Sequence, residues 1–406
     1  MRILIAGAGT IGTNLAAALA TEGQEVVVID SSEAALARLE ASVDCQTIHG
    51  NALSAQTLED LGIRHTDLLV TVTQDDATNM AVCRLADFYN VPRKLARVRN
   101  PEFSDPNCPV PSEHFGIDHI ISPEGIAVEH IRRLVRCPGV LEAVDFEGGR
   151  IALRALLVSE DSTIAGERVI DVRQHLPGSF LVAAIRRGSR VIIPGGSEQV
   201  RIGDTVYLVS APDAVDGLVK AFNPMAHEAR QVLIFGAGVT GMQLARRLAG
   251  ELDRVLLIEK DHARAHRAAD ELDELGVEVL HGSALDVDLL GRCNLDRIDF
   301  FIALSDDDEE NFMSALLFRK FGHGTPIVLT NELHYIDIME SVGLDIVINP
   351  RILASSALLR HIRGSTVLSV ARLHGEEAEM LEFKASAKSA VTKLPLKDQR
   401  LPAGML

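Results

Sequence analysis

The chain contains the pattern GxGxxG twice, as GAGTIG at Gly7–Gly12 and as GAGVTG at Gly236–Gly241. Each copy follows an apolar run typical of a buried strand and precedes a run suited to a helix. An acid, Asp30 in the first copy and Glu259 in the second, ends the next apolar run eighteen residues after the last glycine. Strand, glycine turn, helix and strand form the βαβ unit of a parallel sheet, so the repeat predicts two Rossmann-like sheets.

The similarity between the two halves extends beyond the glycines. HGNA at His49–Ala52 has a counterpart in HGSA at His281–Ala284. Ser122–Pro123 and Asn349–Pro350 occupy the same place before the last helix of each half, where they predict an N-cap followed by a first-turn proline. These secondary landmarks indicate an internal duplication, because two unrelated Rossmann domains would share the glycines alone.

Between the halves the sequence changes to short β segments broken by glycine and proline, as in FLVAAIRRGSRVIIPGG. After the second half, TVLSVARLHGEEAEMLEFKAS predicts a hairpin, and LPLKDQRLPAGML resembles the earlier ERVIDVRQHLPGSFL. We therefore expect an α/β fold with two doubly wound parallel sheets, each followed by a small α+β domain, the second one incomplete. The predicted domains are a Rossmann domain over 1–137, a small domain over 138–224, a second Rossmann domain over 229–364 and a partial small domain over 365–406.

Composition excludes several classes of protein. The formal net charge of −17, with no block of lysines or arginines, argues against nucleic acid as a partner. The sequence shows no signal peptide and no apolar run of membrane-spanning length, so we expect a cytosolic chain. Its five cysteines form no CxxC pair, which argues against a disulfide framework and a thiolate zinc site.

The first glycine motif has the chemistry of a dinucleotide site. Gly7 permits the tight turn, Gly9 allows the backbone to approach a pyrophosphate, and Gly12 allows close packing of helix on strand. Thr10 and Ile11 offer backbone N–H groups at the positive end of the helix dipole. These features predict a phosphate cradle.

Asp30 predicts which dinucleotide this cradle accepts. Its carboxylate can accept hydrogen bonds from both ribose hydroxyls, and one charge-assisted bond contributes about 1.5–3 kcal/mol. The same charge would repel a 2′-phosphate, so the sequence favours NAD(H) over NADP(H).

The second half keeps Gly236, Gly238, Gly241 and Glu259, but its pocket is predicted to be poorer. In the first half ARVRNPEF places Arg97 and Arg99 where they can reach a phosphate or a neighbouring subunit. The corresponding VLTNELHY contains no basic residue before its histidine.

Three other patterns have a structural interpretation that outweighs a functional one. The acidic runs Thr73–Met80 and Ser305–Asn311 open helices, so helix capping is favoured over a cation site. His262 and His266 have a spacing that permits a metal site, yet a solvated helix face is favoured because no further ligand is evident. For the basic run His130–Arg136 we favour packing within an oligomer over nucleic-acid binding.

We predict no catalytic residues and no metal site. A dehydrogenase needs an acid or base and a substrate domain of fair size, whereas the intervening domain here is small and rich in β structure. Ligand binding without turnover is therefore the favoured interpretation, and an NAD-dependent oxidoreductase of the saccharopine-dehydrogenase type is the alternative.

The order GAGTIG, VVVID, HGNA, TVTQDDATNM, ARVRNPEF and ISPEGIAVEHIRRLVR, followed by a β-rich domain and a second set, resembles the TrkA family of regulators of Trk potassium uptake. The resemblance covers essentially the whole chain and implies tandem RCK (KTN) modules. Many such modules carry an acid near the adenine where this chain has Asn51 and Ser283. By motif, the implied nucleotide contacts are Gly7, Ala8, Gly9, Thr10, Ile11, Gly12, Asp30, Thr73, Gln74 and Arg97, and then Gly236, Ala237, Gly238, Val239, Thr240, Gly241 and Glu259.

The resemblance also implies a function. It implies a cytoplasmic protein, peripheral on the inner face of the membrane, that forms dimers and a tetrameric ring under a potassium-translocating subunit of the TrkH or TrkG type. Binding of NAD(H), or of ATP or ADP, would then be coupled to gating through the helices within 122–136 and 349–363. A nucleotide sensor of another transporter, such as a glutathione-gated potassium efflux system, is a further alternative.

Overall fold

The computed structural model describes residues 1–104, 108–176, 178–188, 190–363, 367–373, 378–383, 385–386, 389–395 and 398. By its internal contacts the chain divides into two compact units. The first consists of Met1–Ala127 and Asn349–Ile362, and the second of Val128–Ile348 and Arg363–Leu406. The two units are described separately below.

The first unit is built on a six-stranded sheet in the order β3-β2-β1-β4-β5-β6. All five strand pairings are parallel. The strands are β1 (Arg2–Ala6), β2 (Glu25–Asp30), β3 (Gln46–His49), β4 (Leu68–Thr71), β5 (Arg93–Arg97) and β6 (His119–Ile121). The helices are α1 (Thr10–Thr21), α2 (Glu33–Glu40), α3 (Ala55–Asp60), α4 (Asp76–Phe88), the start of α5 (Pro123–Arg136), and α13 (Pro350–Ile362). This is the predicted doubly wound order, with the strand order reversing between β1 and β4.

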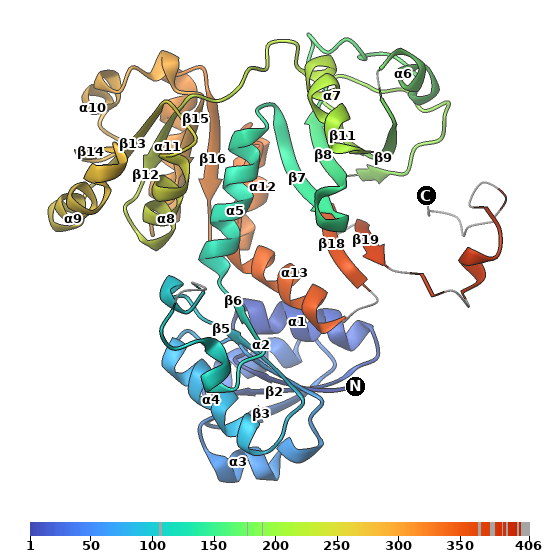
Figure 1. Ribbon diagram of the computed structural model, residues 1–406, viewed down its shortest axis with the longest axis vertical. Coiled ribbons are helices and arrows are strands. Elements are labelled where there is room, and N and C mark those ends of the chain that lie inside the picture. Colours follow the sequence, from blue (N-terminus) through green and yellow to red (C-terminus); the bar gives the residue numbers. More distant parts are fainter. Residues whose placement is uncertain are drawn as a thin grey trace. The chain divides into compact units, whose positions relative to one another are not determined.

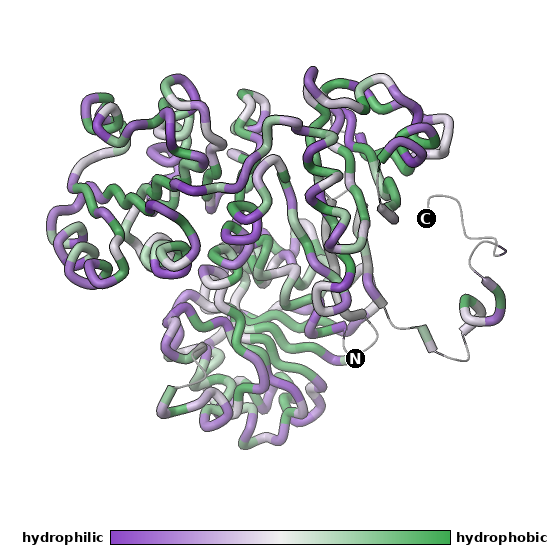
Figure 2. Tube along the Cα trace, turned by 45° about the horizontal axis from the view of Figure 1, so that its top comes forward, coloured by the Kyte–Doolittle hydropathy of each residue, from purple (hydrophilic) through white to green (hydrophobic). Residues whose placement is uncertain are grey.

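Alternation along the strands gives this sheet two buried faces. Ile3 and Ile5 of β1 point to the face that α1 covers, whereas Leu4 and Ala6 point to the face that α4 covers. Figure 2 shows the strands of this sheet as nearly continuous hydrophobic segments. Strands buried on both faces have this composition, which is why the sequence identified them.

Helix α13 completes the core of the first unit, although it follows the second sheet in the sequence. Its Leu358 and Leu359 are fully buried in the same cluster as Leu15 and Leu19 of α1. Figure 1 shows α13 beside α1. The predicted domain boundary at residue 364 follows chain order, and the packing instead places Asn349–Ile362 with the first sheet.

The second unit contains the second six-stranded parallel sheet, in the equivalent order β14-β13-β12-β15-β16-β17. The strands are β12 (Gln231–Phe235), β13 (Arg254–Glu259), β14 (Glu278–His281), β15 (Phe300–Ala303), β16 (Thr325–Leu329) and β17 (Ile346–Ile348). The helices are α8 (Val239–Leu248), α9 (His262–Leu272), α10 (Val287–Arg292), α11 (Asp308–Phe321) and α12 (Leu333–Ser341). The predicted Rossmann repeat is thus confirmed.

The two copies differ before their last strand. The first has two 3₁₀ turns there, Pro101–Ser104 and Ser112–Phe115, whereas the second has helix α12. The sequence analysis did not predict α12. Among its apolar residues Met339 is fully buried, whereas Leu333 and Ile338 are exposed, so no single apolar face marks this helix in the sequence and it depends on tertiary packing.

The small domain of the second unit is an antiparallel sheet in the order β10-β9-β11-β8-β7. Its elements are β7 (Val140–Phe146), β8 (Ile151–Leu157), α6 (Val169–His175), β9 (Phe180–Arg187), β10 (Arg190–Ile192), β11 (Thr205–Ser210) and α7 (Val215–Phe222). The hairpin predicted after the second Rossmann sheet is confirmed as β18 (Val367–Leu373) paired with β19 (Ala378–Phe383). Most of the LPLKDQRLPAGML segment lies outside the described residues.

The predicted helix caps are confirmed. Ser122 Oγ accepts from the N–H of Gly125 at 3.1 Å, and Asn349 Oδ1 accepts from the N–H of Arg351 at 2.9 Å. The acidic runs also cap helices, because Asp75 and Asp307 accept from backbone N–H groups in the first turns of α4 and α11. Within the part of the chain that the structure describes, no helix has the length and apolar character needed to cross a bilayer.

The basic run of α5 is used within the chain. Arg132 Nε lies 2.7 Å from Oε1 of Glu251, and Arg136 Nε lies 3.0 Å from Oε2 of the same carboxylate. These ion pairs lie inside the second unit, so two charges of the run that the sequence assigned to packing within an oligomer are paired within the chain.

Replacing Leu358 with alanine tests the placement of α13. The side chain is fully buried in the first unit, so its truncation should lower the free energy of unfolding by about 2–5 kcal/mol. Denaturant unfolding followed by circular dichroism measures the change. Arg360→Ala, on the exposed side of the same helix, is the matched control and should stay within about 0.5 kcal/mol of wild type. Equal stability of the two variants would contradict the packing of α13.

Candidate nucleotide-binding sites

Both glycine motifs lie at the carboxyl edge of their sheets, between the first strand and the first helix. Gly7 has φ of 116° and Gly236 has φ of 100°, a left-handed conformation that side chains other than glycine rarely adopt. A Cβ atom on Gly7 would also lie 3.0 Å from the backbone nitrogen of Thr73. Two constraints therefore favour glycine at this position: the left-handed backbone conformation and the lack of space for a side chain beside the neighbouring loop.

The third glycine of each motif sets how closely the helix approaches the turn. A Cβ atom on Gly12 would lie 1.9 Å from the carbonyl oxygen of Gly7, and one on Gly241 would lie 1.9 Å from that of Gly236. No side chain fits at such a distance. Helix α1 and helix α8 can therefore begin directly against their glycine turns.

The second glycine of each motif faces open space. A Cβ atom on Gly9 or on Gly238 would have no atom within 4 Å among the described residues. Each of these glycines is the N-cap of its helix and provides no capping side chain. First-turn N–H groups lack partners inside a helix, so the missing cap leaves them available to an anionic ligand. The predicted residues Thr10 and Ile11, with Val239 and Thr240, form these first turns.

A carboxylate holds each glycine turn. Asp30 Oδ2 accepts from the N–H of Ala8 at 2.6 Å, and its Oδ1 accepts from the N–H of Ser32 at 2.7 Å. Glu259 repeats this arrangement with Ala237 at 2.7 Å and Asp261 at 2.8 Å. We call this arrangement the carboxylate clamp. The sequence analysis assigned these acids to a ribose but missed that they also order the loop.

The clamp leaves the acids able to bind a ligand. Each carboxylate oxygen has two lone pairs, so one acceptor position per oxygen remains beside the backbone bond. Asp30 is half-buried, whereas Glu259 is 3% exposed. The first acid is therefore easier for a ribose to reach than the second.

A buried asparagine orders the loop that faces each glycine turn. Asn79 Oδ1 accepts from the N–H and the hydroxyl of Thr73 at 3.0 and 2.7 Å, and its Nδ2 donates to the carbonyl of Arg97 at 2.9 Å. In the second copy, Asn311 Oδ1 accepts from the N–H of Ser305 at 2.9 Å, and its Nδ2 donates to the carbonyls of Ser305 and Leu329 at 2.9 and 3.0 Å. Sequence reasoning missed both asparagines, although a hydroxyl residue precedes each by six positions in the two acidic runs.

Arg97, at the end of β5, lies against the first loop. Its Nη1 donates to the carbonyl of Thr73 at 3.4 Å, and its buried Nε has no hydrogen-bond partner among the described residues. Burial lowers the pKa of this guanidinium, and the nearby Arg99 and Arg351 act in the same direction. Arg99 instead pairs with Glu124 at 2.9 Å, so of the two arginines in ARVRN it is Arg97 that borders the site.

The remaining predicted contacts of the first half are placed as follows. Gln74 lies in the exposed loop that follows Thr73. Asn51 Oδ1 accepts from the N–H of Leu53 at 2.9 Å, so this side chain shapes a local turn. Ser283 has the same role in the second half, where its Oγ accepts from the N–H of Leu285 at 3.1 Å.

The second site forms a cavity of about 220 Å³. Its lining residues are Phe235, Gly236, Gly238, Glu259, Lys260, Arg264, Ser305, Asp306 and Asp307. The cations of this pocket, Lys260 and Arg264, come from the residue after β13 and from α9. The sequence predicted a poorer pocket from the segment after β16 alone, where VLTNELHY has no basic residue before its histidine.

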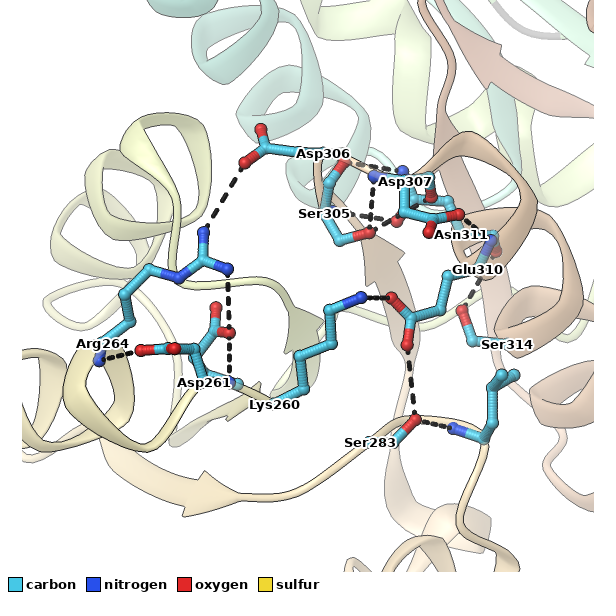
Figure 3. Close-up of polar contacts among 12 residues, drawn as sticks. Lys260, Asp261, Arg264, Ser283, Ser305, Asp306, Asp307, Glu310, Asn311 and Ser314 are labelled. Carbon is cyan, nitrogen blue, oxygen red and sulfur yellow. Dashed lines mark hydrogen bonds and ion pairs between the residues drawn. The ribbon is translucent and has the colours of Figure 1, made fainter.

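Both cations of the second cavity are paired with acids (Figure 3). Lys260 Nζ contacts Glu310, a hydrogen bond that raises the pKa of the lysine. Arg264 lies between two acids, with Nη2 at 3.6 Å from Glu259 and Nη1 at 3.6 Å from Asp306. A ligand entering this cavity must therefore compete with internal ion pairs.

The histidines of α9 have partners other than a metal. His266 Nδ1 lies 3.0 Å from Asp270, and the ring of His262 contacts that of His281 edge-on with centroids 5.1 Å apart. Across the described residues, no group of three histidine, cysteine or acidic side chains is arranged to hold a metal ion.

Alanine substitutions in the first glycine motif test this geometry. Gly12→Ala should disrupt the contact between α1 and the turn and lower the melting temperature of the chain by several degrees. Gly9→Ala is the matched control, because its methyl group meets open space and should leave the melting temperature nearly unchanged. Differential scanning calorimetry measures both. Equal melting temperatures for the two variants would contradict the close approach of α1 to the glycine turn at Gly12.

Comparison with known proteins agrees with the duplicated architecture. The TrkA-N domain family matches the chain twice, at residues 3–123 and 232–350, and the TrkA-C domain family matches residues 153–223. The GsuK channel bound to NAD shares the fold, with a TM-score of 0.62 at 18% identity over 89% of this chain and 63% of that chain.

Relatives match along the entire sequence. The chain is 32% identical to the Trk system potassium uptake protein TrkA of Vibrio alginolyticus, over 100% of this chain and 89% of that protein. It is also 32% identical to the TrkA homolog of Archaeoglobus fulgidus, over 92% of this chain and 84% of that protein. The chain therefore belongs to the TrkA family of Trk system potassium uptake proteins.

Proposed function

We propose that this chain is a nucleotide-responsive regulatory subunit of a Trk-type potassium uptake system. In this proposal an adenine nucleotide binds at the first glycine turn and alters the activity of a membrane subunit that carries potassium. The proposal combines membership of the TrkA family with the geometry of the two glycine sites.

The observation that carries the proposal is the carboxylate clamp at the first site. Asp30 lies directly beside the uncapped start of α1, so a ribose on the acid would place its phosphates at the first-turn N–H groups. The arrangement satisfies the chemistry of NAD(H), and the negative charge of Asp30 disfavours a 2′-phosphate. GsuK channel structures were solved with NAD and with ADP, so these two ligands are the first to test here.

The second site supports weaker binding. Glu259 is nearly inaccessible, and Arg264 bridges it to Asp306 across the cavity. A nucleotide would have to displace these contacts, and their loss reduces the net binding free energy. We therefore propose that the first site fills at lower ligand concentration than the second.

Regulation requires a partner protein whose conformational equilibrium changes when the nucleotide binds. We propose that the chain assembles with itself, as dimers and a tetrameric ring, on the cytoplasmic side of a potassium-translocating subunit of the TrkH or TrkG type. A bound nucleotide shifts such an assembly only by its difference in affinity for two conformations.

Asp30→Asn tests the first site. The amide keeps the shape of the side chain but removes the charge and one acceptor, so NADH affinity should fall by about ten-fold or more. The preference for NADH over NADPH should shrink as well. Isothermal titration calorimetry on the full chain measures both changes. Glu22→Gln, at the opposite end of α1, is the charge-matched control and should bind NADH like wild type; an Asp30→Asn variant with wild-type NADH affinity would refute the assigned pocket.

A pulldown from detergent-solubilised membranes tests the partner. The tagged chain should retain a potassium-translocating subunit, and the retained amount should change when NADH or ADP is added. The Asp30→Asn variant should retain the partner without this nucleotide dependence. Retention of a potassium efflux transporter would instead support the alternative sensor role, and steady NADH oxidation with a metabolite at 340 nm would support an oxidoreductase.

A further inference from the structure

A residue that follows the second sheet reaches the first glycine turn. Arg351 lies in the first turn of α13, and its Nη1 donates to Oγ1 of Thr10 at 3.2 Å. Thr10 is the first residue of α1, where an anionic ligand would meet the helix start. Both residues belong to the first compact unit.

Arg351 and Arg97 approach the same place. The charge of Arg351 is close enough to Arg97 to lower the pKa of its guanidinium, and the buried Nε of Arg97 is unpartnered within the described part of the chain. Two like charges beside a helix start repel each other unless an anion lies between or beside them. A phosphate group satisfies both, since a guanidinium matches its oxygens in bidentate geometry.

Two acids lie near Arg97. Asp76 accepts from the backbone N–H groups of Arg99 and Asn100, at 2.9 Å each. Glu124 forms an ion pair with Arg99 through Oε1 at 2.9 Å, and its buried Oε2 has no hydrogen-bond partner among the described residues. Both acids raise the pKa of Arg97 and so partly offset the repulsion between the arginines.

The two copies differ at this position. Pro350–Arg351 corresponds to Pro123–Glu124 in the repeat, so the position after the shared proline carries opposite charges. The two residues also have different partners, because Glu124 pairs with Arg99 and Arg351 donates to Thr10. The arginine occurs on the helix that covers the first glycine turn.

We propose that Arg351 contacts the phosphates of a nucleotide bound at the first site and thereby links that site to the second Rossmann sheet. Only Asn349 separates β17 of that sheet from α13. A phosphate that holds Arg351 therefore restrains a segment joined directly to the second sheet. This inference rests on the proposed function, because it requires a nucleotide at Gly7–Gly12.

Titrations of the full chain with ADP and with adenosine test the proposal, because the two ligands differ only in phosphates. Arg351→Ala should weaken ADP binding by about ten-fold or more and change adenosine binding by less than about two-fold. Arg351→Lys, which keeps a charge but not the fork of donors, should lie between wild type and Arg351→Ala. Arg360→Ala removes the same charge from the exposed side of α13 and should bind both ligands like wild type. Inorganic phosphate should compete with ADP in wild type and more weakly in Arg351→Ala.

Hydrogen exchange gives a second measurement on the same variants. ADP should slow amide exchange over residues 349–362 in wild type and not in Arg351→Ala, whereas adenosine should slow it in neither. An unchanged ratio of ADP to adenosine affinity in both Arg351 variants would overturn this inference and leave the proposed function intact. Failure of the wild-type chain to bind any adenine nucleotide would instead refute the proposed function itself.

Discussion

The carboxylate clamp is the interaction on which the rest of this structure depends. The glycine turn has a left-handed first residue and leads into a helix without a capping side chain. Its own residues therefore supply few interactions that fix its conformation. The acid at the end of the second strand supplies two charge-assisted hydrogen bonds, to the N–H of Ala8 and of Ser32 in the first copy. The clamp fixes where the helix begins, and the third glycine then sets how close it lies. The same acid therefore orders the turn, and in the proposed function it also receives the ribose of a bound nucleotide.

The two glycine sites differ in the exposure of the acid and in the partners of the nearby cations. The first site has a half-buried acid and an Arg97 whose Nε has no partner among the residues that the structure describes, and α13 brings Arg351 to it. The second site has a buried acid and cations already paired with Glu310 and Asp306. The same fold therefore carries two glycine sites that differ in the exposure of the acid and in the pairing of the nearby cations. This difference is the basis of our proposal that the first site fills at lower ligand concentration than the second.

Sequence reasoning identified the fold because the strands are buried on both faces. Strands such as VVVID are continuous apolar runs ended by a charged residue, and the glycines and caps that follow them have fixed spacings. The two sheets, the caps at Ser122 and Asn349 and the roles of Gly7 and Gly12 could therefore be predicted. The placement of α13 could not, because the helix follows the second sheet in the chain and its sequence does not record that it packs on the first. Helix α12 was missed because its stability comes from packing.

The sequence also predicted the residues of the two sites only in part, because several of their contacts depend on tertiary packing. Asp30 and Glu259 were found from their distance to the glycines, but their bonds to Ala8 and Ala237 depend on the three-dimensional approach of the loops. The sequence did not predict that Lys260, Arg264 and Arg351 lie at these sites. Each comes from a segment whose position relative to the glycine turn depends on tertiary packing. The most direct test of the account is an experimental structure of the full chain with saturating NADH. It should show the adenosine ribose on Asp30 and the pyrophosphate over Gly7–Gly12, whereas an empty first site under those conditions would contradict the account.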